Sequence, residues 1–219
     1  MVDLAWDSVE THKLASASAD STAAVWDTET CRRRRRFNVG AMGVPVNSVA
    51  VRGDIVWTGS DDGLARAFDE RAHSRAGAGI ELRHNVSDLL GSAEQARDTN
   101  TLSPVTSLSL PAGEAHALFT GSVDGLIRVW DTRQTDAPVT VLAGHSEAVT
   151  CVRVDPFGSY LLSNSIDRTL RVWDIRPFAP QQRCVKVFGG HMHNFEQQLI
   201  KCAWSPDCSM VAAGSSDRL

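Results

Sequence analysis

Three side chains in the second half of the sequence are of the types that form a hydrolytic triad. Ser163 could act as a nucleophile, His145 as its base and Asp167 as the group that orients this base. Two observations argue against catalysis: the sequence has no Gly-x-Ser-x-Gly elbow, and Ser163 lies in the middle of a predicted strand, where its oxygen would not face a pocket. We therefore predict no catalytic residues and no enzymatic activity.

A second group of side chains is of the types that ligate metal ions: His191, His193, Cys202 and Cys208. A His-x-His pair on a strand points its two rings to opposite faces, and the cysteine spacing is not that of zinc sites. We expect no metal and no other cofactor. His191 follows two glycines and is interpreted as structural, while Cys202 is interpreted as a small core residue.

Five consecutive arginines at 32–36 form the most conspicuous charged segment. Their position shortly after an aromatic-Asp pair predicts the outermost strand of a sheet, where charge prevents pairing with other chains. A contact with RNA or with a nuclear import receptor is the alternative. The edge strand is favoured because no aromatic stacking platform accompanies the run in the sequence.

Repeated units of short strands must position these residues. A small residue or Ser, then any residue, then Asp, followed six residues later by an aromatic-Asp pair, recurs along the chain. The first Asp residues lie 42, 62, 43 and 50 residues apart, near the length of one propeller blade. Besides Asp167 with its Trp173, the residues of this signature are Asp20, Trp26, Asp27, Asp62, Phe68, Asp124, Trp130, Asp131, Asp174 and, in a fifth copy, Asp217.

Within each repeat the apolar residues alternate with period two, which indicates strands. In the clearest copy, strands are predicted over residues 149–154, 160–165, 169–175 and 184–188. Gly63 and Gly125 predict tight turns between the second and third strands, because such turns require positive φ. Four antiparallel strands per radial unit predict an all-β propeller in a single domain. The repeat copies lie at about 1–31, 32–72, 102–137, 138–180 and 181–219, with an inserted loop over 73–101.

The composition is that of a globular protein. The chain has 219 residues, and 22 basic against 26 acidic side chains give a net charge of −4. This balance provides no electrostatic basis for wrapping nucleic acid, and no apolar stretch approaches the roughly 20 residues that cross a bilayer. The beginning of the sequence has no secretory signal pattern, and the five cysteines form no Cys-x-x-Cys pair. We expect a reduced cytosolic or nuclear compartment and no membrane association.

The spacing of Gly144 and His145 to Asp167 and Trp173 resembles the pattern of the WD-repeat family, and the copies cover nearly the whole chain. The resemblance implies that His145, Ser163, Asp167 and Trp173 form a hydrogen-bonded tetrad inside one blade. Other copies depart from this pattern: Phe68 replaces Trp, Ala213 replaces Ser, and no Gly-His pair precedes the second and third copies. We expect those blades to be held mainly by packing and strand pairing.

Several idiosyncratic segments are similar to the WD-repeat subunits of the spliceosomal U5 small nuclear ribonucleoprotein. They include Arg-Pro-Phe-Ala-Pro at 176–180 and His-Asn-Phe-Glu at 193–196. The resemblance implies a non-enzymatic scaffold of nuclear pre-mRNA splicing, whose partners are the large U5 scaffold protein and neighbouring spliceosome subunits, with at most indirect RNA contact. The expected partner-binding residues are Arg176, Pro177, Phe178, Pro180, His193, Asn194, Phe195 and Glu196. The alternative is an adaptor or substrate receptor of a ubiquitin ligase or of a chromatin complex.

The family resemblance also implies seven blades, whereas this sequence accounts for four nearly complete copies and half of a fifth. Trp6 and Trp204 occupy the same place in the first strand of their copies. Our hypothesis is that the chain is an incomplete, truncated seven-bladed ring.

Overall fold

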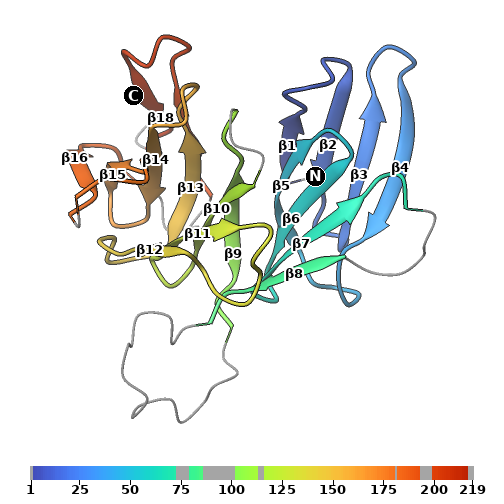
Figure 1. The fold of residues 1–219 in the computed structure, drawn as a ribbon, viewed down its shortest axis with the longest axis horizontal. Helices are drawn as coiled ribbons and strands as arrows, with labels where there is room; N and C mark the ends of the chain where they lie inside the picture. The colour runs from blue at the N-terminus through green and yellow to red at the C-terminus, as the bar shows by residue number, and fades with distance from the viewer. Residues whose placement is uncertain are drawn as a thin grey trace. The chain divides into compact units, whose positions relative to one another are not determined.

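The computed structural model describes residues 2–72, 79–85, 102–112, 116–180, 182–192 and 199–216, and the regular structure in these ranges consists of β-strands (Figure 1). Among the described residues, no helix has the length and apolar character to cross a membrane. The chain divides into two compact units. The first contains Met1–Leu108 and Thr135–Ala137, and the second contains Ser109–Gln134 and Pro138–Leu219.

The strands form sheets that follow one another along the chain, and we number these sheets as blades 1 to 5. Blade 1 contains β1 (Asp3–Trp6), β2 (Lys13–Ala17), β3 (Thr22–Asp27) and β4 (Arg32–Asn38). Blade 2 contains β5 (Val46–Arg52), β6 (Ile55–Ser60), β7 (Leu64–Asp69) and β8 (Ile80–Arg83). Both blades lie in the first unit, and each is an antiparallel meander in which every strand pairs with the next.

The remaining strands repeat this plan. Blade 3 contains β9 (Val105–Ser109), β10 (Ala117–Ser122), β11 (Ile127–Asp131) and β12 (Thr140–Leu142). Blade 4 contains β13 (Val149–Val154), β14 (Tyr160–Ser165), β15 (Thr169–Asp174) and β16 (Cys184–Gly189). In blade 5 the described residues form two strands, β17 (Cys202–Trp204) and β18 (Val211–Ala213). The predicted all-β fold of four-stranded antiparallel sheets is confirmed.

Each unit has its own apolar core, because alternate residues of the inner strands point away from solvent. In the first unit Val25, Val49 and Val56 belong to one buried cluster. In the second unit Leu161 and Trp173, which face each other across β14 and β15, belong to another. These cores fix the positions of the strands and of the turns at their ends, from which the side chains of the candidate site project.

The turns between the second and third strands have the expected left-handed backbone. Gly63 has φ 76° and Gly125 has φ 80°, as predicted from the glycines alone. In blades 1 and 4 the same turn uses Ser21 (φ 66°) and Arg168 (φ 62°). The turn therefore keeps its geometry where the glycine is absent.

Two features of the second and later repeats differ from the sequence analysis. Residues 80–83 form β8, the fourth strand of blade 2, although the whole segment 73–101 was assigned to an inserted loop. Leu82 on this strand and His84 directly after it are completely buried, which stabilises a strand too short to be recognised locally. The repeat copies also do not coincide with the sheets, because the fourth strands of blades 1, 3 and 4, namely β4, β12 and β16, fall into the following copy.

Candidate functional site

Blade 4 brings together the four side chains of the expected tetrad. The His145 Nδ1 atom lies 2.8 Å from Asp167 Oδ2, and its Nε2 atom lies 2.7 Å from Ser163 Oγ. Trp173 Nε1 donates a hydrogen bond of 2.8 Å to the same Ser163 oxygen. Because the carboxylate accepts from Nδ1–H, Nε2 is the acceptor for the Ser163 hydroxyl. The network therefore joins the second strand, the following turn and the third strand of one sheet.

This arrangement is structural and does not match a hydrolytic site. Ser163 is completely buried on β14, and its oxygen is already occupied by Trp173 and His145. A nucleophile needs an oxygen that a substrate can reach. The Ser-His-Asp set therefore stabilises the blade.

The tetrad predicts a pH-dependent stability. Burial lowers the pKa of His145 below its usual value of 6.5. Below pH 6.5 the imidazole is therefore protonated in the unfolded chain but not yet in the folded blade. The contribution of neutral His145 to the free energy of unfolding is fully present above pH 6.5, and it is lost as the pH falls towards the lowered pKa of the folded state. We expect His145→Gln to remove this component. Urea unfolding of both proteins over a pH series measures it, and identical pH profiles would contradict the assignment.

The carboxylate of the tetrad remains ionised over this range. Burial alone would raise the pKa of Asp167, but hydrogen bonds from Thr169 and His145 lower it to about 2. The contribution of Asp167 is therefore lost only at much lower pH than that of His145.

The recurring Asp residues of the sequence signature close turns. In blades 1 to 4 the first Asp of the signature accepts a hydrogen bond from the backbone N–H two residues later, and the second Asp does the same, which is the geometry of an Asx-turn. The first-Asp pairs are Asp20 with Thr22 (3.2 Å), Asp62 with Leu64 (3.1 Å), Asp124 with Leu126 (3.0 Å) and Asp167 with Thr169 (2.9 Å). The second-Asp pairs are Asp27 with Glu29, Asp131 with Arg133 and Asp174 with Arg176, each at 3.0 Å.

Blade 3 replaces the histidine with an arginine. Arg128 is completely buried, and its guanidinium lies 2.8 Å from Asp124 Oδ2 and 2.9 Å from Ser122 Oγ. Ser122 also donates a hydrogen bond to the other oxygen of this carboxylate. Besides the packing and strand pairing expected of blades without Gly-His, blade 3 thus contains a buried polar network in which a cation four residues after the Asp takes the place of the histidine.

Blade 2 contains the same cluster with one addition. Arg66 lies 2.7 Å from Asp62 Oδ2 and 3.1 Å from Ser60 Oγ, and it also pairs with Glu81 on β8 at 3.1 Å. The sequence signal that could have identified both clusters is Ser-x-Asp followed four residues later by Arg. This spacing occurs at 60–66 and 122–128, and also at 165–171 in blade 4, where His145 pairs with Asp167 and Arg171 Nε instead donates to Thr169 Oγ1 at 3.3 Å.

The aromatic positions follow the chemistry of their side chains. Trp26 donates its indole N–H to Ser16 at 2.8 Å, and Trp130 donates to Thr120 at 2.9 Å. Phe68 has no donor and instead packs on Phe37, with ring centroids 5.1 Å apart. The replacement of Trp in blade 2 is thus accommodated by an aromatic contact.

The described histidine and cysteine side chains that could ligate a metal ion do not lie together in one site. In the described part of the chain, no group of three His, Cys, Asp or Glu side chains is arranged to hold a metal ion. Cys202 is buried in an apolar cluster with Cys151, and Cys208 lies in the turn before β18 with φ 57°. His191 lies just after β16, and His193 lies outside the described residues.

The arginine run forms β4, at the edge of blade 1, as predicted. Arg34 pairs with Asp27 at 3.3 Å and with Glu10 at 3.1 Å, and Arg36 lies 3.6 Å from Asp20. Acidic side chains of the same blade therefore balance part of this charge.

The loop from β15 to β16 presents the aromatic side chain that the sequence singled out. Phe178 is fully exposed. The loop is held by Arg183, whose guanidinium donates to the carbonyl oxygens of Asp174 (3.2 Å) and Arg176 (3.1 Å). Pro177 and Pro180 are exposed in this loop. The other expected partner-binding residues, His193, Asn194, Phe195 and Glu196, and the signature residue Asp217, lie outside the described residues.

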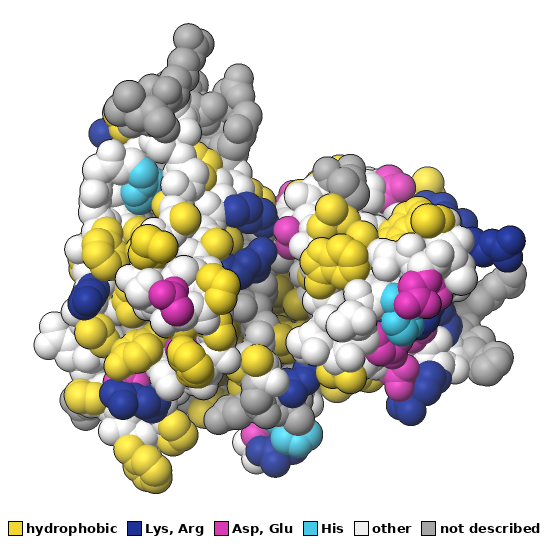
Figure 2. Space-filling view, turned by 90° about the horizontal axis from the view of Figure 1, so that it is seen from above, with side chains coloured by type: hydrophobic (Ala, Val, Ile, Leu, Met, Phe, Trp, Pro, Cys, Tyr) yellow, Lys and Arg dark blue, Asp and Glu magenta, His cyan; other side chains and the backbone are white. Residues whose placement is uncertain are grey.

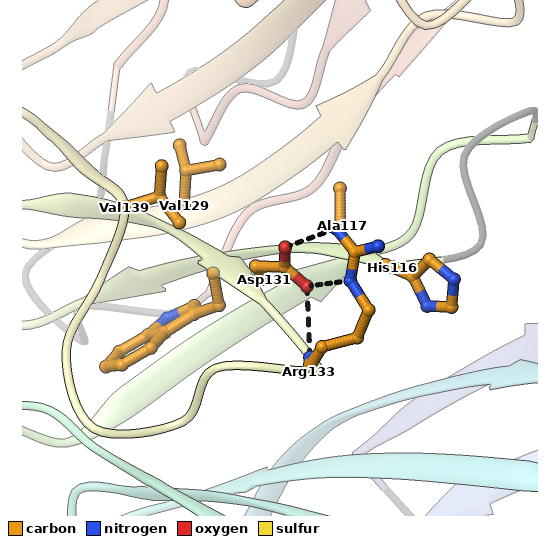
Figure 3. Close-up of a pocket in the computed structure, with 7 residues that line it drawn as sticks. His116, Ala117, Val129, Asp131, Arg133 and Val139 are labelled. Carbon is orange, nitrogen blue, oxygen red and sulfur yellow. Dashed lines mark hydrogen bonds and ion pairs between the residues drawn. The ribbon is translucent and has the colours of Figure 1, made fainter.

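A cavity of about 430 Å³ opens on blade 3, beside β11 (Figure 3). Its apolar lining consists of Ala117, Val129, Trp130 and Val139. Arg133 folds back onto Asp131 with an N–O distance of 2.7 Å, and this contact lowers the pKa of Asp131 to about 2. His116 completes the lining. The charged side chains of the lining, Asp131 and Arg133, are thus paired with each other.

Comparison with known proteins gives consistent matches. The 40 kDa protein of the U5 small nuclear ribonucleoprotein from Homo sapiens is 43% identical over 193 residues, which cover 88% of this chain and 48% of the relative. The protein of the same name from Dictyostelium discoideum is 36% identical over 219 residues, 100% of this chain and 56% of the relative. Pre-mRNA-splicing factor cwf17 of Schizosaccharomyces pombe is 30% identical over 220 residues, 100% of this chain and 58% of the relative.

The chain thus spans about half the length of these relatives. The family model described as WD domain, G-beta repeat matches residues 97–131, 136–174 and 182–219. These matches agree with the four-stranded sheets, with the Asp-closed turns and with the buried tetrad of blade 4. The chain belongs to the WD-repeat family.

Proposed function

We propose that this chain acts as a non-enzymatic scaffold for protein–protein interactions in the U5 small nuclear ribonucleoprotein and takes part in nuclear pre-mRNA splicing. The observation that carries the proposal is the 43% identity to the U5 40 kDa protein over 88% of the chain. The similarity to pre-mRNA-splicing factor cwf17 is consistent with it. The geometry adds four-stranded sheets with loops at the strand ends, and such loops are suited to binding other proteins.

The partners are the large U5 scaffold protein and neighbouring spliceosome subunits, and RNA contact is indirect. The loop at 176–180 is the docking element. A fully exposed apolar side chain on a hydrogen-bonded loop makes few contacts within its own fold. Aromatic side chains of this kind, once buried in a partner, contribute most of the binding energy of many protein interfaces. Phe178 has this position.

We expect Phe178→Ala to reduce co-purification of U5 proteins and U5 RNA with the tagged chain about tenfold or more, because loss of an aromatic anchor removes about 2 kcal/mol of binding energy. Met42→Ala is the matched control, since Met42 is equally exposed in the first unit. The measurement is affinity purification from nuclear extract with mass spectrometry and RNA probing. Unchanged recovery of U5 components would remove the role of this loop, and recovery of ubiquitin ligase or chromatin subunits in their place would overturn the proposed function.

A further inference from the structure

Two of the five free cysteines lie side by side where blade 4 meets blade 5. Cys151 is on β13 and Cys202 is the first residue of β17, and 0% and 4% of these residues are exposed. They belong to one buried cluster, whose other buried members are aliphatic. The sequence analysis treated Cys202 only as a small core residue. A second thiol in the same cluster gives the pair a chemistry that a single core residue lacks.

The two thiol groups face each other across the interface. Cys151 Sγ lies 3.9 Å from the carbonyl oxygen of Cys202, and Cys202 Sγ lies 4.0 Å from the carbonyl oxygen of Cys151. The thiols also hydrogen-bond to each other. This bond lowers the pKa of Cys151, whose sulfur accepts it, and raises the pKa of Cys202, which donates it. A thiol that ionises more readily therefore lies beside one that keeps its proton.

Hydrogen bonds on both sides of the pair fix its register. Thr150 Oγ1 donates to the carbonyl oxygen of Ile200 at 3.0 Å, before the two cysteines in their strands. Trp204 Nε1 donates to the carbonyl oxygen of Arg153 at 3.0 Å, after them. Because β13 and β17 belong to different sheets, no backbone ladder joins these strands. The side-chain bonds therefore hold the two sulfur atoms opposite each other.

The pair is buried, but only a small sheet covers it on one side. The described residues of blade 5 form two strands of three residues each, β17 and β18. Partly buried side chains such as Tyr160, Trp204 and Val211 pack against the cluster. Hydrophobic side chains also reach the surface of the second unit (Figure 2, left). Since local opening of a few short strands costs less free energy than global unfolding, a small oxidant can reach the thiols without unfolding the whole chain.

We propose that Cys151 and Cys202 form a disulfide bond between blade 4 and blade 5 when the protein meets hydrogen peroxide. In the first step the Cys151 thiolate attacks one peroxide oxygen, the O–O bond breaks, and the sulfur becomes a sulfenic acid while the departing hydroxide takes up a proton as water. In the second step the Cys202 sulfur attacks the sulfenic sulfur, the S–O bond breaks, and the Cys202 proton leaves with the hydroxide as a second water.

Two thiols and one peroxide thus give one disulfide and two molecules of water, and a thiol reductant reverses the change by exchange. The modification connects two sheets that otherwise meet only through side chains. It goes beyond the proposed function as a scaffold and does not depend on it.

The test treats the folded 219-residue chain with hydrogen peroxide, blocks the remaining thiols under denaturing conditions, and analyses the tryptic peptides by mass spectrometry without reduction. We expect one main crosslinked product, which joins peptide 134–153 to peptide 202–218 and is lost after treatment with dithiothreitol. The first peptide contains Cys151, whereas the second contains both Cys202 and Cys208. Cys208→Ser is therefore the matched control and is expected to keep the crosslink, while Cys202→Ser is expected to abolish it.

A second measurement follows the stability of the chain. The disulfide closes a loop from residue 151 to residue 202 and constrains the unfolded chain, so we expect peroxide to raise the urea concentration at which the second unit unfolds. Dithiothreitol is expected to restore the original value. Cys31→Ser removes an exposed thiol of the first unit and is expected to leave this shift unchanged.

Peroxide treatment in urea is the reference, because the cysteines of an unfolded chain pair without a fixed geometry. A folded chain that yields the Cys151–Cys202 crosslink no more often than the chain in urea would overturn the inference. The same holds if Cys208 replaces Cys202 in the main product, or if peroxide oxidises Cys31 and leaves Cys151 and Cys202 as free thiols.

Discussion

Replacing Asp124 with Asn is expected to lower the free energy of unfolding by about 3 kcal/mol, because it removes the negative charge that lies 2.8 Å from the completely buried Arg128 guanidinium. The charge of Arg128 has no route to solvent in the folded blade, and the Ser122 hydroxyl is a weak substitute for an anion 2.8 Å away. Chemical denaturation of the variant and the wild-type chain measures the difference.

The equivalent change in blade 2 is the matched control. Arg66 faces both Asp62 and Glu81, so Asp62→Asn leaves one carboxylate at 3.1 Å from the guanidinium. We expect this variant to lose less than half as much stability as Asp124→Asn. Equal losses of stability at the two sites would show that the lost Asx-turn hydrogen bond, which both Asp residues accept, matters more than the ion pair with Arg.

Replacing Glu70 with Gln is expected to destabilise the first unit by a similar amount, about 3 kcal/mol. Lys13 is completely buried on β2, and its ammonium group lies 2.5 Å from Glu70 Oε2 and 2.5 Å from the carbonyl oxygen of Gly53. The next carboxylate, that of Glu10, is 3.9 Å away. The Gln side chain keeps the shape of Glu but not its charge, so a buried cation loses its main counter-charge.

Two further variants test this explanation. The double substitution Lys13→Met with Glu70→Leu removes both charges and is expected to recover the lost stability, since an apolar pair carries no desolvation cost. Arg71→Gln disrupts the exposed pair with Asp54, and we expect no measurable change there. A Glu70→Gln chain that unfolds at the wild-type denaturant concentration would contradict the buried-pair assignment.

Much of the fold follows from local sequence. The period-two alternation and the turn residues predicted four-stranded units, and Gly63 and Gly125 predicted left-handed turns that the structure contains. The repeated Asp residues are equally local, because an Asx-turn needs only the carboxylate and the N–H two residues later. The exposed position of Phe178 was likewise anticipated from the idiosyncratic loop sequence.

Other features depend on contacts between segments that are distant in the sequence. The strand β8 is four residues long, and its pairing with β7 and the burial of Leu82 decide that it forms. The burial of Lys13 depends on Glu70, which the next blade supplies.

The sequence by itself determined the strands, the turns and the repeated Asp-aromatic signature, because alternation of side chains and turn geometry are properties of a few consecutive residues. The tertiary structure alone decided that the Lys13 side chain is buried beside a carboxylate of the next blade. A lone Lys in a strand is normally exposed, and it can be buried only where folding brings a carboxylate within hydrogen-bonding distance, as Glu70 of the next blade does for Lys13.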